Sequence, residues 1–127
     1  ELNIDGSAKT GSDGKPIPVF GDGRTARDYT YITDIVDGVI ACTQKTFGFE
    51  IFNLGESQTV TLSQLIALLE EALGQPAILD RQPIQPGDVP ITFADISKAR
   101  ERLGYQPRVK IADGIPLFVD WFRQNNP

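Results

Sequence analysis

The chain has 127 residues, 40% of them hydrophobic and 23% charged, which is the composition of one compact globular domain and excludes a disordered tail or a fibrous repeat. Seventeen acidic residues against twelve basic give a formal net charge of -5, which argues against nucleic acid or an anionic membrane as a partner. With no histidine and a single cysteine, Cys42, the sequence predicts no metal site, no disulfide scaffold and no histidine acid–base chemistry.

The start of the chain leads us to expect a piece of a longer protein. Methionine is absent, and the first residue, Glu1, is not an initiator. Residues 1–16 are rich in Gly, Ser, Asp and Lys without apolar periodicity and predict a flexible lead-in, so that 17–127 form the domain. No apolar run approaches the roughly eighteen residues of a membrane span, and we expect a cytoplasmic protein.

Four short strands are predicted along the chain. Residues 17–20 are apolar and end at a glycine turn, and 28–32 are rich in β-favouring side chains. Residues 49–54 are nearly all apolar, which predicts a strand buried on both faces, and 77–80 are expected to return as a fourth strand. Proline and glycine then hold 83–90 out of a helix, and a loop constrained in this way is a usual place for ligand contacts.

Two helices are predicted between these strands. The first is expected to begin at a Thr33 cap, with four apolar side chains on one face: Ile35, Val36, Val39 and Ile40. The second begins at a capping box of Thr61 and Gln64 and ends at Gly74. Its apolar stripe consists of Leu62, Leu65, Ile66, Leu69, Ala72 and Leu73. Glu70 and Glu71 are expected on its solvated face.

Two more helices are predicted towards the end of the chain. Asp95 is expected to cap a short one that ends at Gly104 and carries Ile96, Ala99 and Leu103. Asp113 is expected to open the last, with Pro116 in its first turn. Its inward side chains are expected to be Ile115, Phe118, Val119 and Phe122, with Trp121 as a packing anchor. Three further aromatic residues are assigned to the core: Phe47, Phe49 and Phe52. The alternation of strands and helices predicts a small mixed α/β layer.

Three segments are candidates for ligand binding. The first is Arg24-Thr-Ala-Arg27-Asp28-Tyr29. An arginine presents a planar fork that suits phosphate oxygens, although the spacing alone favours a solvated Arg-Asp pair on a loop. Gly21-Asp22-Gly23 would let a ligand approach the backbone, but taken alone it is most often a turn. The segment Gln85-Pro86-Gly87-Asp88 reads equally well as a carboxylate held for a sugar diol and as a rigid surface turn.

These candidates lie within a longer series of motifs. In chain order the series is Pro16-Ile-Pro-Val-Phe-Gly-Asp-Gly23, Arg27-Asp-Tyr-Thr-Tyr-Ile-Thr-Asp34, Phe52-Asn-Leu-Gly55, Pro86-Gly-Asp-Val-Pro90 and Leu103-Gly-Tyr-Gln-Pro107. It resembles the C-terminal part of NAD-dependent nucleotide-sugar epimerases and dehydratases, the extended short-chain dehydrogenase/reductase family. The resemblance implies a small mixed α/β substrate-binding domain with alternating short strands and helices, lacking the Rossmann half, and it favours the binding role for Arg27.

The resemblance implies roles for single residues in holding a UDP-sugar. Pro18 and Phe20 match the strand edge that borders the uracil ring in UDP-sugar epimerases. Arg27 matches the arginine that reaches the diphosphate, and Asp88 matches the aspartate near the nucleotide ribose.

The second phosphate arginine of the family is replaced in this sequence. Many galactose epimerases carry an arginine three residues before the aspartate, where this chain has Gln85. Arg81 lies nearby in the sequence and is a candidate substitute. The motifs look more like those of UDP-glucuronate 4-epimerases than those of UDP-galactose 4-epimerases.

Two motifs of the family are missing from the chain. There is no glycine-rich dinucleotide fingerprint, and no tyrosine is followed four positions later by lysine. The sequence therefore predicts no catalytic and no cofactor-binding residue here. NAD is expected in the full-length enzyme, which the resemblance implies is a homodimer, and the chain alone is expected to be inactive. The alternatives are a nucleotide-sugar 4,6-dehydratase, a UDP-glucuronate decarboxylase and a non-catalytic nucleotide-binding module.

Overall fold

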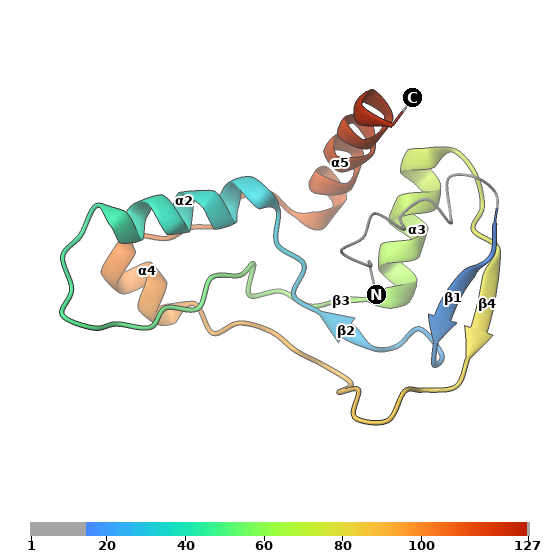
Figure 1. Cartoon of the computed structure of the whole chain (residues 1–127), viewed down its shortest axis with the longest axis horizontal. Coiled ribbons are helices and arrows are strands. Elements are labelled where there is room, and N and C mark those ends of the chain that lie inside the picture. The colour runs from blue at the N-terminus through green and yellow to red at the C-terminus, as the bar shows by residue number, and fades with distance from the viewer. Residues whose placement is uncertain (1–14, 127) are drawn as a thin grey trace.

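Two groups of elements make up the chain in the computed structural model, which describes residues 15–126 (Figure 1). One group contains helices α2 (Ile32–Thr43) and α4 (Ser97–Leu103). The other contains helices α3 (Leu62–Leu73) and α5 (Ile111–Asn125), which pack against each other, and two strands. This is the small mixed α/β fold that the sequence predicts. Almost all of the predicted lead-in lies outside the described residues.

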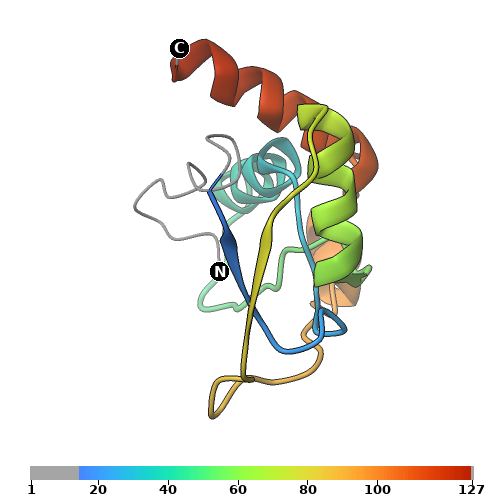
Figure 2. The same cartoon turned by 90° about the vertical axis from the view of Figure 1, so that its right-hand side faces the viewer.

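The two strands beside α3 form a parallel pair. Strand β1 (Ile17–Phe20) lies next to β4 (Leu79–Gln82), with Ile17 opposite Leu79 and Phe20 opposite Gln82 (Figure 2). The prediction for the first strand is confirmed, and the fourth strand begins two residues later than predicted. Parallel strands need a long crossover connection, and helices α2 and α3 lie on it.

A second, antiparallel pair leads directly into α3. Strand β2 (Ala26–Arg27) pairs with β3 (Val60–Thr61), and neither was predicted. The capping box of α3 is confirmed: Thr61 Oγ1 accepts from the N–H of Gln64 at 3.2 Å, and Gln64 Oε1 accepts from the N–H of Thr61 at 2.9 Å. Gly74 ends the helix in the left-handed conformation, as predicted.

The buried core of the first group lies around α4. Ile96, Ala99, Leu103 and Tyr105 are buried together, which confirms the predicted stripe. Partly buried side chains packed on this cluster are Ala41, Cys42, Phe47, Phe52, Leu54 and Ala94. The predicted Asp95 cap is not confirmed, because the N-cap of α4 is Ile96, which makes no side-chain cap bond. Asp95 lies one residue earlier, and its carboxylate accepts from the N–H of Ser97 at 2.9 Å.

The strand predicted over 28–32 is wrong. Asp28 follows β2 directly, and its carboxylate accepts backbone hydrogen bonds from Glu56, Ser57 and Ala94 at 2.8 to 3.0 Å. Side-chain-to-backbone hydrogen bonds therefore hold this segment in place of the strand pairing that the β propensity of its residues predicts.

The strand predicted over 49–54 is also wrong. Within residues 15–126 it pairs with no other strand, and Phe49 and Ile51 are 85% and 68% exposed. The prediction that Phe49 belongs to the core fails with it. Phe47 and Phe52 do pack together, with ring centroids 5.3 Å apart. An apolar run forms a buried strand only where neighbouring strands are present to bond its backbone.

Helix α2 begins without the predicted Thr33 cap. Its N-cap is Tyr31, which makes no side-chain cap bond. The buried residues of the helix are Asp34 and Gly38. A Cβ atom at Gly38 would lie 2.7 Å from a methyl carbon of Leu54, so glycine permits the close approach of this segment.

The predicted apolar face of α2 is largely exposed within the described residues. Val36, Val39 and Ile40 are 44 to 51% exposed, and Ile32, one turn earlier, is 63% exposed. A helix normally turns such a face towards a partner, so this face is unpartnered in residues 15–126.

Helix α5 begins at Ile111, two residues before the predicted start at Asp113. Pro116 therefore lies inside the helix rather than in its first turn. Phe118 stacks on Trp121 with ring centroids 6.0 Å apart, although Trp121 is 56% exposed. None of the helices in the described part of the chain has the length and apolar run that crossing a membrane requires.

Candidate functional site

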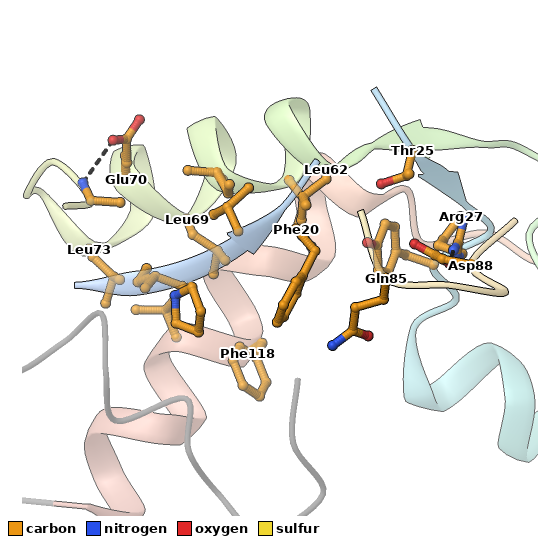
Figure 3. A pocket seen from close by; sticks show the side chains of 18 of the residues that line it. Phe20, Thr25, Arg27, Leu62, Leu69, Glu70, Leu73, Gln85, Asp88 and Phe118 are labelled. Carbon is orange, nitrogen blue, oxygen red and sulfur yellow. Dashed lines mark hydrogen bonds and ion pairs between the residues drawn. The ribbon is translucent and has the colours of Figure 1, made fainter. Parts of the chain in front are cut away.

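A cavity of about 670 Å³ lies against β1, between helices α3 and α5 and the loop 83–90 (Figure 3). One end is polar and the other apolar. The polar end is lined by Thr25, Arg27, Tyr29, Gln85 and Asp88. The apolar end is lined by side chains that include Leu69, Leu73, Phe118 and Phe122. Such a combination of an apolar wall with a few convergent polar groups is typical of small-molecule sites.

The strongest polar contact of the site joins Arg27 to Asp88. The guanidinium Nη2 lies 2.5 Å from the carboxylate Oδ1, and both side chains are about one-third exposed, 30% and 34%. Arg27 Nη1 also donates to the carbonyl of Ala26 at 2.9 Å. The sequence favours a local, solvated pair of Arg27 with a neighbouring aspartate. Arg27 pairs instead with Asp88, 61 positions later, and this contact joins β2 to the loop 83–90.

A tight turn places Asp88. Its N–H donates to the carbonyl of Gln85 at 3.2 Å, with Pro86 and Gly87 between them and a φ of +86° at Gly87. Proline followed by glycine with positive φ is the signature of a type II turn. The surface turn is therefore confirmed, and it carries the Asp88 carboxylate to the cavity; the contact with a sugar diol stays a prediction.

Backbone hydrogen bonds fasten this loop to β2. The N–H of Ala26 donates to the carbonyl of Pro90 at 2.8 Å, and the N–H of Thr92 donates to the carbonyl of Ala26 at 3.2 Å. Arg27 and Asp88 therefore meet on two segments that are tied together next to them.

Five of the six predicted site residues lie on this cavity. Pro18 and Phe20 line it from β1, and Arg27, Gln85 and Asp88 line its polar end. Arg81 does not line it; its Nη1 lies 3.5 Å from the carbonyl of Gly21 on the surface. Arg81 is therefore not grouped with the other five residues, and its role as a second phosphate ligand stays a prediction.

The turn Gly21-Asp22-Gly23 has no room for a ligand at its second glycine. Gly21 and Gly23 have φ of +78° and +84°, and a Cβ atom at Gly23 would lie 2.2 Å from Ser63 Oγ. Arg24 pairs with Asp22 at 2.5 Å and is 88% exposed. The turn therefore serves to connect β1 to β2 against the start of α3.

Thr25 and Tyr29 also line the cavity; both lie in the first candidate segment, but neither is assigned as a binding residue from the sequence. Burial raises the pKa of the Tyr29 phenol, against an opposing effect of the Arg27 charge, so the phenol keeps its proton at neutral pH. Both residues flank Arg27 in the sequence, and that adjacency was the signal that could have identified them.

Glu70 also differs from its prediction as part of a solvated helix face. It lines the apolar end of the cavity, and its Oε1 accepts from the N–H of Ala77 at 2.8 Å. This bond fastens the chain after α3 to the helix, so Glu70 has a structural role.

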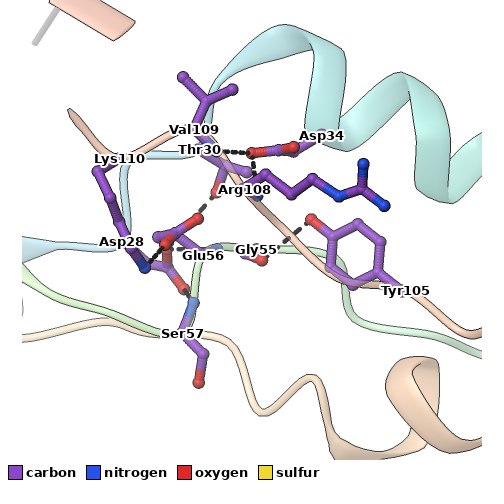
Figure 4. A network of polar contacts seen from close by, with 10 residues as sticks. All are labelled: Asp28, Thr30, Asp34, Gly55, Glu56, Ser57, Tyr105, Arg108, Val109 and Lys110. Carbon is purple, nitrogen blue, oxygen red and sulfur yellow. Dashed lines mark hydrogen bonds and ion pairs between the residues drawn. The ribbon is translucent and has the colours of Figure 1, made fainter. Parts of the chain in front are cut away.

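A second polar cluster contains Asp34 and Glu56 (Figure 4). Glu56 is buried and pairs with Lys110 at the start of α5, and its Oε2 has no partner within residues 15–126. Asp34 accepts from the N–H groups of Arg108 and Val109 at 3.0 and 2.9 Å. The cluster joins segments distant in sequence. No group of three or more Cys, Asp or Glu side chains in the described residues is placed to hold a metal ion.

Comparison with known proteins gives one consistent group of relatives. The family described as GDP-mannose 4,6 dehydratase matches residues 4–117. The UDP-glucuronate 4-epimerase of Thermodesulfobacterium geofontis is 42% identical over 112 residues, which make up 87% of this chain and 34% of the relative. The chain spans about a third of the length of the curated relatives it matches.

Solved structures give the same result. The UDP-glucuronic acid 4-epimerase of Bacillus cereus, in complex with UDP-glucuronic acid and NAD, matches with a TM-score of 0.82 at 34% identity, over 89% of this chain and 37% of that one. The UDP-glucose 4-epimerase of Thermotoga maritima, with UDP-glucose, matches with a TM-score of 0.86 at 34% identity, over 94% of this chain and 38% of that one.

Proposed function

This chain belongs to the family described as GDP-mannose 4,6 dehydratase, which comprises nucleotide-sugar epimerases and dehydratases of the extended short-chain dehydrogenase/reductase class, and we propose that it binds the nucleotide-sugar substrate in an NAD-dependent UDP-sugar 4-epimerase. The observation that carries the proposal is the polar end of the cavity, where Arg27 and Asp88 meet beside the strand edge of Pro18 and Phe20.

Each part of the cavity suits one part of a UDP-sugar. Arg27 offers a planar fork for the diphosphate, because guanidinium N–H groups pair with phosphate oxygens in parallel. Pro18 and Phe20 offer an apolar edge for the uracil ring, and Asp88 offers carboxylate oxygens near the ribose. Gln85 is an uncharged hydrogen-bonding group at the position of the second phosphate arginine. Arg81 points elsewhere, and we do not include it in this site.

The remaining two-thirds of the relatives' length supports a larger enzyme around this chain. The exposed apolar side chains of α2, and Phe49 and Ile51 beyond it, form surface that a monomeric protein rarely leaves open. We propose that further parts of the enzyme cover this surface. The homodimeric state and the cytoplasmic location expected from the sequence stay predictions.

The turn at residues 21–23 does not fit the pyrophosphate of NAD. A dinucleotide pyrophosphate binds at a glycine-rich turn that opens a helix, but the turn at Gly21 and Gly23 leads into a strand and is filled by Ser63. We therefore propose that NAD, which accompanies substrate in the Bacillus cereus epimerase, is bound in this enzyme by residues outside the chain.

A 4,6-dehydratase is the second candidate, because the matching family bears that description. A UDP-glucuronate decarboxylase would use the same substrate grip. These reactions share the binding step that this chain provides, and they differ in the groups that act on the sugar.

Two measurements test the proposal. Calorimetric titration of the 127-residue chain with UDP is expected to show saturable binding, and GDP is expected to bind more weakly. Product analysis of the longer protein on UDP-glucuronate and UDP-glucose is expected to give the C4 epimers. A 4-keto-6-deoxy sugar would identify a dehydratase, and a pentose product a decarboxylase. Binding of UDP without turnover of either sugar by the longer protein would indicate a non-catalytic module, and absence of UDP binding would contradict the proposed site.

A further inference from the structure

The contacts of Arg27 hold its guanidinium from two sides. Nη1 donates to the Ala26 carbonyl in its own strand, and Nη2 donates to Asp88 across the cavity mouth. Each bond uses one N–H of a group that carries several, so donors remain on the guanidinium for a ligand. An arginine side chain held in this way has lost most of its rotamer freedom before any ligand arrives.

The position of Asp88 does not depend on Arg27. The turn from Gln85 sets its backbone, and the bonds of Ala26 to Pro90 and Thr92 tie the loop to β2. Because proline and glycine restrict this turn, the backbone of Asp88 is placed by the turn geometry rather than by the salt bridge. A fixed carboxylate facing a long, flexible cation is the arrangement expected where the anion orients the cation.

We propose that Asp88 is a positioning residue for Arg27: by holding Nη2, it fixes the guanidinium in the orientation that receives the diphosphate of the nucleotide sugar. The inference rests on the proposed function and adds a role to the ribose contact suggested for Asp88. Part of the affinity for the diphosphate therefore depends on Asp88, a residue that itself carries a negative charge.

The direction in which UDP affinity changes when the Asp88 charge is removed distinguishes a positioning role from electrostatic repulsion. Asp88 carries the same charge as a diphosphate, so removal of its charge would tighten UDP binding if Coulomb repulsion were its main effect. Loss of positioning has the opposite result, because an unrestrained Arg27 must be ordered when the ligand binds. If Asp88 contacted only the ribose, Asp88→Asn would weaken the binding of uridine and of UDP by the same factor.

The experiment measures UDP and uridine affinities of the 127-residue chain and its variants by calorimetry and NMR titration. Asp88→Asn keeps the shape of the side chain and removes its charge, and Arg27→Ala removes the group that it positions. Asp37→Asn, an equal change of charge on an exposed residue of α2, is the control. Far-UV circular dichroism checks that each variant is folded.

We expect Asp88→Asn to weaken UDP binding roughly tenfold and uridine binding much less, while Asp37→Asn leaves both unchanged. In the Arg27→Ala background, Asp88→Asn should weaken UDP binding no more than it weakens uridine binding. Tighter UDP binding, an equal loss for uridine, or full additivity with Arg27→Ala would each overturn the positioning role while leaving the UDP site in place. Failure of the unaltered chain to bind UDP would overturn the proposed function and this inference with it.

Discussion

The carboxylate of Asp28 accepts a hydrogen bond from the backbone N–H of Ala94 at 3.0 Å and thereby joins two segments 66 positions apart. The same carboxylate accepts from the N–H groups of Glu56 and Ser57 at 2.8 and 3.0 Å. One side chain therefore satisfies backbone donors of two separate segments that have no strand partner at these points. Asp28 also directly follows Arg27, which lines the cavity.

Replacement of Asp28 is expected to be strongly destabilising. Asp28→Ala leaves three N–H groups without their acceptor, and we expect the free energy of unfolding to fall by about 2–4 kcal/mol. Asp28→Asn keeps one carbonyl acceptor and should lower the free energy of unfolding by less. Urea unfolding of the chain followed by circular dichroism measures both. The control Asp37→Asn should stay within about 0.5 kcal/mol, and an equally small effect of Asp28→Ala would contradict this account.

Ser57 has a backbone φ of +57°, which lies in the left-handed region that residues other than glycine rarely adopt. We expect Ser57→Gly to raise the free energy of unfolding by about 0.5–1 kcal/mol, because relief of the strained conformation exceeds the entropy cost of glycine. Ser57→Ala keeps the Cβ atom and should bring no gain. A gain for alanine equal to that for glycine would show that the backbone is not the cause.

Because the phenol of Tyr105 is buried, we expect the folded state to lose stability at alkaline pH. Burial, with a further contribution from the Asp34 carboxylate, raises the pKa of its phenol, and the hydroxyl donates to the Gly55 carbonyl at 3.0 Å. The folded state therefore keeps this proton at a pH where the unfolded state releases it. The stabilising contribution is complete below the unfolded pKa of about 10 and is lost as pH rises through the higher folded value.

Tyr105→Phe tests this dependence. It removes the hydrogen bond and should cost about 1 kcal/mol at pH 7. The difference between wild type and variant in the urea midpoint should shrink as pH rises above 10. A constant difference between pH 7 and pH 11 would show that the phenol does not titrate differently in the two states.

The role proposed for Arg27 depends on its fork geometry as well as its charge. Arg27→Lys keeps the charge and loses the parallel donors, so we expect the Kd for UDP to rise about tenfold. Arg24→Lys is a matched control, because Arg24 pairs with Asp22 on the surface outside the cavity. Calorimetry measures both variants. Unchanged UDP affinity of Arg27→Lys would rule out the diphosphate contact.

The 127-residue chain is expected neither to bind NAD nor to epimerise a UDP-sugar. Its sequence has no glycine-rich dinucleotide fingerprint and no tyrosine followed four positions later by lysine. NAD titration should show no saturable signal, and chromatography should show no product from UDP-glucuronate. The longer protein, assayed in parallel, is the positive control, and turnover by the 127-residue chain would refute the prediction.

Local signals predicted the elements whose ends are decided by neighbouring residues. The capping box of Thr61 and Gln64, the stop at Gly74 and the buried stripe around Ala99 all lie within a few residues of the structures they determine. Predictions failed where the outcome depends on distant partners. Residues 49–54 have the composition of a buried strand but no strand beside them within the described chain, and the propensity of 28–32 is outweighed by the bonds of Asp28.

The sequence by itself determined the family, because the order and spacing of its motifs are read along the chain. It also determined which residue types are present for the nucleotide-sugar site that we propose. Only the tertiary structure decided that Arg27 and Asp88, 61 positions apart, share one cavity mouth and that Arg81 lies outside it. The physical reason is that the hydrogen bonds joining Ala26 to Pro90 and Thr92 are formed by backbone groups. Backbone groups are common to all residue types, so the pattern of side chains in the sequence does not predict these bonds.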